Sequence, residues 1–119
     1  MTDTTTVQWD DTLDAIEKCY DLGWTDGLPV VPPTEARVAQ FLEVAGLEPS
    51  HSIGDIPERR RQVTAGKVAA NAVMAGCLPE YIPVVLAATE AMLDPVFNLV
   101  GPSSSMGGAA VLVMVNGPV

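Results

Sequence analysis

The residues best suited to chemistry lie around Cys77, where the patterns of two predicted helices meet. Cys77 follows Gly76 and precedes Pro79, a residue that interrupts helical periodicity. If Cys77 lies at the start of the following helix, the positive end of the helix dipole favours its thiolate, which is the nucleophilic, redox-active and metal-binding form. The same position also fits a small buried residue in a tight interhelical turn, because free cysteine is among the most buried residue types.

Glu80 and Tyr81 follow Cys77 closely, and the three residues form the predicted catalytic group. A carboxylate in a first helical turn ordinarily interacts with the helix dipole, but a desolvated carboxylate can serve as a general base. One helix earlier, Asn71 lies one turn after Lys67 and shares its face. Asn71 is therefore a candidate substrate ligand, with a solvated cationic face as the alternative.

An arginine run offers a second kind of chemistry. Arg59, Arg60 and Arg61 form the only basic run in an acidic chain. The planar guanidinium group is suited to carboxylate or phosphate, and Arg60 is the candidate substrate ligand in this run. The alternatives are a solvated charge run, salt bridges to Asp55 or Glu58, and contact with an acidic patch on a partner.

Residues 98–108 are expected to form a glycine- and serine-rich loop before the last apolar run. It contains Ser103, Ser104 and Ser105, whose hydroxyls and backbone N–H groups could bind an anion. Nucleotide-binding loops follow a strand and open a helix, and the P-loop ends in Lys-Ser or Lys-Thr, so this segment does not match them. The three serines are therefore candidate substrate ligands without being a nucleotide signature.

The sequence predicts no metal site within this chain and identifies no cofactor. Cys19 and Cys77 are far apart, and His51 is the only histidine. Structural zinc sites need four such ligands, and neither cysteine belongs to a Cys-x-x-Cys pair. In a cytosolic chain both thiols are expected to be reduced. Cys19 is expected to be structural, because it lies in an amphipathic helix.

Helical periodicity predicts four helices that position these residues. The first ends at Gly23 and carries Leu13, Ile16 and Tyr20 on its apolar face. Three further helices follow, each bounded by a capping or helix-breaking residue: 35–45 after Thr34, 65–75 after Thr64, and 80–93 before Asp94.

The connections between the predicted helices differ in character. Residues 24–34 contain three prolines, which predict a stiff extended segment. Residues 47–63 show neither helical nor strand periodicity, and a loop of this length is usually functional or mobile. Small residues dominate the third helix, so another backbone segment is expected to approach it closely.

The last apolar run, Ala109 to Val115, reads as a strand covered on both faces, because it is continuous and bounded by glycine and a Gly-Pro pair. Such a strand needs hydrogen-bonding neighbours, and the rest of the chain supplies few. The expected fold class is therefore α/β, with about four helices and a C-terminal strand that completes a sheet with another chain.

The composition sets the class of protein. The chain has 119 residues, of which 48% are hydrophobic and 18% charged, and its net charge is −9. The low charged fraction favours burial against a partner, and the acidity argues against nucleic acid as a ligand. Neither a signal peptide nor a membrane span is recognisable, so a soluble cytoplasmic protein is expected. Residues 1–8 are expected to be a disordered tail, and residues 9–119 a single incomplete domain.

Three stretches carry a resemblance to a known family: residues 23–34, residues 70–81 and residues 111–118. They resemble the start of a largely uncharacterised bacterial family, some of whose members are associated with small proteins bearing a (seleno)cysteine-Gly-Ser-Cys motif. Leu78 stands where the family carries a basic residue, which weakens any anion role there. The family extends beyond the equivalent of Pro118, so the resemblance implies a split gene or a cleaved precursor.

Together these features predict a subunit of a soluble bacterial heteromeric enzyme that acts on a small polar metabolite, with its active site at the subunit interface. Hydrolase, lyase and thiol chemistry all stay open. Precursor cleavage after Val119 could expose a nucleophile at the start of the next chain. The alternative is a non-catalytic structural or binding subunit that stabilises a catalytic partner, with Cys77 merely packed.

Overall fold

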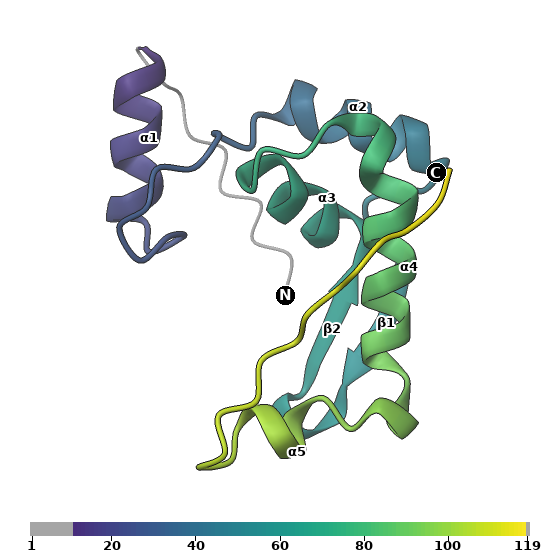
Figure 1. Cartoon of the computed structure of the whole chain (residues 1–119). Coiled ribbons are helices and arrows are strands. Elements are labelled where there is room, and N and C mark those ends of the chain that lie inside the picture. The colour runs from purple at the N-terminus through teal and green to yellow at the C-terminus, as the bar shows by residue number, and fades with distance from the viewer. Residues whose placement is uncertain (1–10, 119) are drawn as a thin grey trace.

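The computed structural model describes residues 11–118, so the predicted tail, residues 1–8, lies outside the described residues. Helices and a two-stranded antiparallel sheet build the fold, in agreement with mixed α and β content (Figure 1). The helices and strands are α1 Thr12–Asp21, α2 Glu35–Ala45, β1 Ser52–Ile56, β2 Arg61–Thr64, α3 Ala65–Met74, α4 Ile82–Leu93 and α5 Val100–Ser103. Short 3-10 turns lie at η1 Pro57–Arg59, η2 Pro79–Tyr81 and η3 Pro95–Phe97.

The predicted capping residues begin and end the helices as expected. The Arg37 N–H donates to Thr34 Oγ1 at 3.3 Å, and the Lys67 N–H donates to Thr64 Oγ1 at 3.4 Å. These bonds satisfy backbone donors that have no partner within the helix. Gly46 ends α2 in the left-handed conformation, with φ of 66°. Local sequence therefore determines the bounds of α2 and α3.

The core lies where α2, α3 and α4 meet. Its fully buried side chains include Phe41 from α2, Val73 from α3 and Ile82 from α4. The predicted close approach to α3 is confirmed at Gly66, where a Cβ atom would lie 3.0 Å from the Pro49 carbonyl oxygen. Apolar burial between these helices supplies most of the stabilisation available to the fold.

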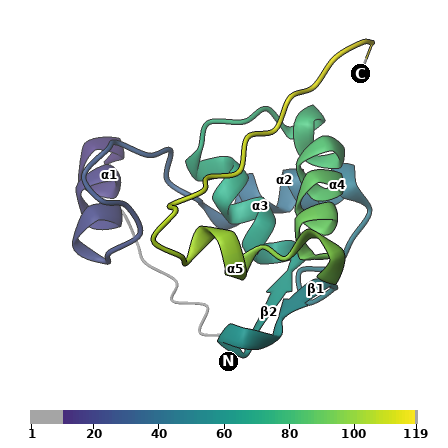
Figure 2. The same cartoon turned by 60° about the horizontal axis from the view of Figure 1, so that its bottom comes forward.

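Helix α1 lies apart from the other helices in both views (Figures 1 and 2). The predicted apolar face is wrong for this helix: Ala15 and Cys19 are buried, whereas Leu13 is 72% and Tyr20 is 58% exposed. Periodicity identifies which residues share a face of a helix. The surrounding structure decides which face is covered.

Residues 47–63, expected to lack regular structure, form an antiparallel hairpin from β1, η1 and β2. The register pairs Gly54 with Val63 and Ile56 with Arg61, and an irregularity interrupts it between Ser52 and Gly54. Two short strands with an interrupted register leave little period-2 signal in the sequence.

Helix α4 supports this hairpin. A Cβ atom at Gly54 would lie 3.0 Å from Leu93 Cβ, so glycine at this position favours the close approach of β1 to α4. Among residues 11–118, no single helix is long and apolar enough to cross a membrane. Pro79–Leu93 and Pro95–Ser103 pass that test only as a pair, bent by 67°.

The segment Ala109–Val115 is extended but is not a strand within this chain (Figure 1). Within this chain Leu112 is 81% and Met114 is 78% exposed. Val111 and Val113 are less exposed, at 42% and 51%. This alternation is typical of an extended segment with two faces. The described residues of this chain do not cover the segment, and its burial by another chain stays a prediction.

Candidate functional site

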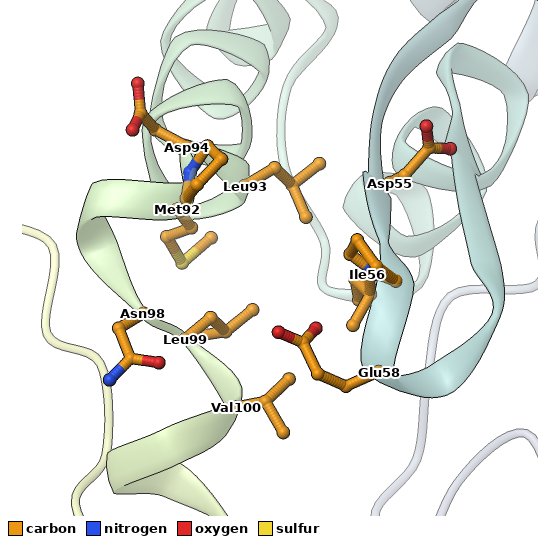
Figure 3. A pocket seen from close by; sticks show the side chains of 11 residues that line it. Asp55, Ile56, Glu58, Met92, Leu93, Asp94, Asn98, Leu99 and Val100 are labelled. Carbon is orange, nitrogen blue, oxygen red and sulfur yellow. The ribbon is translucent and has the colours of Figure 1, made fainter.

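An open cleft of about 390 Å³ lies between the turn of the hairpin and the bent segment after α4, residues 94–99, which we call the elbow (Figure 3). One wall is the end of β1 with the turn that follows it, and the other is the end of α4 with the turn that leads to α5. Turns of this kind commonly carry binding residues. The lining residues are Asp55, Ile56, Pro57, Glu58, Met92, Leu93, Asp94, Pro95, Asn98, Leu99 and Val100.

The cleft combines an apolar floor with a carboxylate. Leu93, Leu99 and Ile56 provide apolar surface, and the Glu58 side chain points from the hairpin turn toward α5 (Figure 3). The carboxylates of Asp55 and Asp94 point away from the cavity in the same view. This arrangement can contact an apolar body on one side and accept hydrogen bonds at Glu58.

Local sequence shapes the elbow wall. The Val96 N–H donates to Asp94 Oδ1 at 2.9 Å, which caps η3 immediately after α4 ends. Asn98 then adopts the left-handed conformation, with φ of 54°. A Cβ atom at Gly101 would lie 2.7 Å from Asn98 Nδ2, so a larger residue there would displace the end of the Asn98 side chain. The sequence interpretation missed Glu58 and Asn98, although Asp94-Pro95 marked the turn.

One hydrogen bond joins the two segments that were predicted to bind an anion. Arg59 Nη2 donates to Ser104 Oγ at 3.3 Å across 45 residues of sequence. The bond connects the end of η1 to the residue after α5, and both elements also contribute residues to the cleft lining. No salt bridge joins the arginine run to Asp55 or Glu58 in the described part of the chain, so the predicted pairing with these acids is not observed.

The other members of this predicted group differ in their hydrogen bonds. Arg60 is exposed and adopts the left-handed conformation, with φ of 49°. The Ser103 hydroxyl donates to the Leu99 carbonyl, and the Ser105 hydroxyl donates to the Pro102 carbonyl at 2.8 Å. Residues 98–108, expected to be a loop, include the short helix α5. Ser104 is therefore the predicted serine that the fold places against an arginine.

Cys77 terminates α3. Its N–H donates to the Ala72 carbonyl at 3.0 Å, and the Gly76 N–H donates to the Val73 carbonyl at 2.9 Å. With Gly76 at φ of 79°, these bonds form a Schellman motif. The half-buried Cys77 side chain packs against the core. Cys77 thus lies at the junction between α3 and the helical segment formed by η2 and α4, as the sequence predicts, but its N–H bonds to the negative end of α3.

Glu80, Tyr81 and Asn71 lie near the same end of the molecule as Cys77. Glu80 and Tyr81 are exposed in η2. Asn71 Nδ2 donates to the Lys67 carbonyl at 2.8 Å, so this amide is occupied within its own helix. Helix α4 spans about 18 Å at 1.5 Å per residue. It separates the predicted catalytic group from the cleft, so this chain does not bring the two groups together.

Cys19 fits the structural interpretation, and His51 lies at the surface. Cys19 is fully buried, and burial raises the pKa of its thiol. His51 is exposed, and its backbone N–H donates to the Glu48 carbonyl at 3.0 Å. Across residues 11–118, no group of three or more His, Cys, Asp or Glu side chains is arranged to hold a metal ion.

A second hollow of about 360 Å³ lies between α1 and the following loop, with Tyr20 and Leu28 in its lining. Neither candidate cleft was anticipated from sequence.

Comparisons of the chain with family models, curated proteins and solved structures find no match. The resemblance seen in the sequence stays an expectation.

Proposed function

We propose that this chain is a subunit of a heteromeric enzyme that acts on a small polar metabolite. We further propose that it joins a companion polypeptide through the docking segment, Ala109–Val115. The observation that carries the proposal is the exposure of this uniformly apolar segment. A contiguous exposed apolar surface of this kind marks an interaction site.

Strand addition is the mode of docking that fits the segment best. Its backbone is extended, and the two side-chain faces carry Val111, Val113 and Val115 on one side and Leu112 and Met114 on the other. A companion sheet edge would satisfy the backbone groups while its covering layers bury both faces. Burial of Leu112 and Met114 alone would contribute about 3–6 kcal/mol before the costs of association.

The position of the docking segment supports an active site at the subunit interface. Ser104 and Ala109 are five residues apart in sequence. At no more than about 3.5 Å per residue, a companion paired at Ala109 would lie within about 18 Å of Ser104. Residues of the companion could then complete the cleft next to Arg59.

Paired substitutions test the docking segment. We expect Leu112→Asp with Met114→Asp to abolish assembly, because charges at these positions would be buried without partners. Leu13→Asp with Leu28→Asp is the matched control, since those leucines are 72% and 73% exposed outside the segment. Light scattering after chromatography of the particle from its native cells measures assembly. A wild-type chain that runs as a stable 12.5 kDa monomer there would overturn the proposal.

A non-catalytic subunit is the second candidate, and the capping role of Cys77 favours it. The Schellman motif accounts for the position of Cys77 without any chemistry. Alkylation by iodoacetamide at neutral pH in the assembled particle separates the two candidates. Reaction faster than that of an unfolded peptide thiol supports thiol chemistry, whereas slower reaction favours the structural role.

A further inference from the structure

We infer that the arginine turn, residues 59–61, together with Ser104 binds the carboxylate or phosphate group of a small molecule held in the cleft. This inference deepens the proposed function, on which it rests, by giving the metabolite an anionic group. The first observation is the Arg59–Ser104 hydrogen bond of 3.3 Å, which fixes one guanidinium between the hairpin and α5.

The register of the hairpin places a second guanidinium on the cleft side. Arg61 pairs directly with Ile56. Side chains of directly paired residues lie on the same face of a sheet, and Ile56 lines the cleft. Arg61 therefore belongs to the hairpin face that Ile56 presents to the cleft, while Arg59 donates to Ser104 directly after α5.

The charge distribution singles out this turn. Three of the six Lys and Arg residues of the chain are consecutive here, although the net charge is −9. In the described residues no carboxylate neutralises them through a salt bridge. Arg60 also occupies a left-handed conformation, at φ of 49°, which glycine or asparagine adopts at lower cost. A strained, uncompensated cationic turn is typical of a binding feature.

The surroundings restrict the ligand to a small molecule. Arginine forks recognise carboxylate and phosphate through paired charge-assisted hydrogen bonds. The apolar floor of the cleft accommodates a short carbon body, and Glu58 can accept a hydrogen bond from a hydroxyl or ammonium group. A polyanion would meet the many acids of this chain, so an extended phosphate backbone does not fit.

Anion titrations of the isolated full chain at constant ionic strength test the site. Inorganic phosphate and lactate are the probes, and the backbone amide NMR signals of Arg59, Arg61 and Ser104 are followed. We expect saturable shifts in the wild type. The double variant Arg59→Gln with Arg61→Gln should bind each probe at least about tenfold more weakly. Arg59→Lys keeps the charge but removes the fork, so its binding should also weaken. Arg37→Gln, on α2, removes an equal charge and should leave binding unchanged.

Three results would overturn the inference. The shifts could fail to saturate with either probe, Arg37→Gln could weaken anion binding as much as the double variant does, or the probes could shift the amide signals of residues outside the arginine turn and Ser104. A different pair of results would assign the turn to an acidic protein partner instead. In that case the wild-type chain binds neither probe, and the double variant Arg59→Gln with Arg61→Gln alone loses assembly. The proposed function fails separately. If the chain binds the anion but never assembles with another polypeptide, the anion site stands and the proposed function fails.

Discussion

Gly76→Ala tests the structural account of the junction that holds Cys77. Gly76 has φ of 79°, a conformation that costs an L-residue about 1–2 kcal/mol. No atom outside its immediate neighbours lies within 4 Å of a Cβ placed there. The cost is therefore one of backbone conformation, without a steric clash. We expect the free energy of unfolding to fall by about 1–2 kcal/mol.

Urea unfolding followed by far-UV circular dichroism measures this loss. With a slope of about 1.5 kcal/mol per molar urea, the midpoint should fall by about 1 M at an unchanged slope. Gly46→Ala should cost the same, because Gly46 has φ of 66° and nothing within 4 Å of its Cβ position. The two glycines end their helices with the same hydrogen bond: the N–H of Leu47 donates to the Leu42 carbonyl, and the N–H of Cys77 donates to the Ala72 carbonyl.

Gly107→Ala is the matched control. Gly107 has no positive φ, and its Cβ position is 3.4 Å from Ser105 Oγ, an ordinary contact. Its stability should stay close to that of the wild type. If Gly76→Ala were as stable as Gly107→Ala, α3 would not end in a left-handed residue. The explanation of Cys77 by helix termination would then be wrong.

Two further predictions concern α3 and α1. Thr64→Ala should cost about 1 kcal/mol in urea unfolding, because it leaves the Lys67 N–H without its side-chain acceptor, whereas Thr64→Ser should retain most of the stability. Burial raises the pKa of Cys19 in the folded chain, so the unfolded chain loses this proton first as the pH rises. Stability should be complete at neutral pH and decline in alkaline solution, and Cys19→Ala should show less of this decline. An alkaline decline of equal size in Cys19→Ala would contradict that assignment.

The helices could be predicted because their signals are local. Thr34 and Thr64 cap helices that begin at the next residue, and Gly46 ends α2 where expected. Each signal acts through bonds between residues only a few positions apart. The sequence also predicted that Cys19 is a structural residue, and Cys19 is buried in its amphipathic helix.

The cleft could not be predicted, because long-range contacts build it. The hairpin rests on α4 through Gly54 and Leu93, and the Arg59–Ser104 bond spans 45 residues. Nothing in residues 47–63 alone shows that they meet the elbow after α4. The sequence placed Cys77 at a helix junction, but only the structure shows that its backbone and side chain belong to the end of α3 and the core.

The docking segment shows both contributions. Its residue types by themselves determined an extended apolar stretch that needs cover, because both of its faces are apolar. Only the tertiary structure decided that this cover is lacking within the described chain: the hairpin pairs its own two strands, and Leu112 and Met114 stay in solvent. Apolar pattern is a property of a few neighbouring residues, whereas burial depends on which distant surfaces come to lie against them.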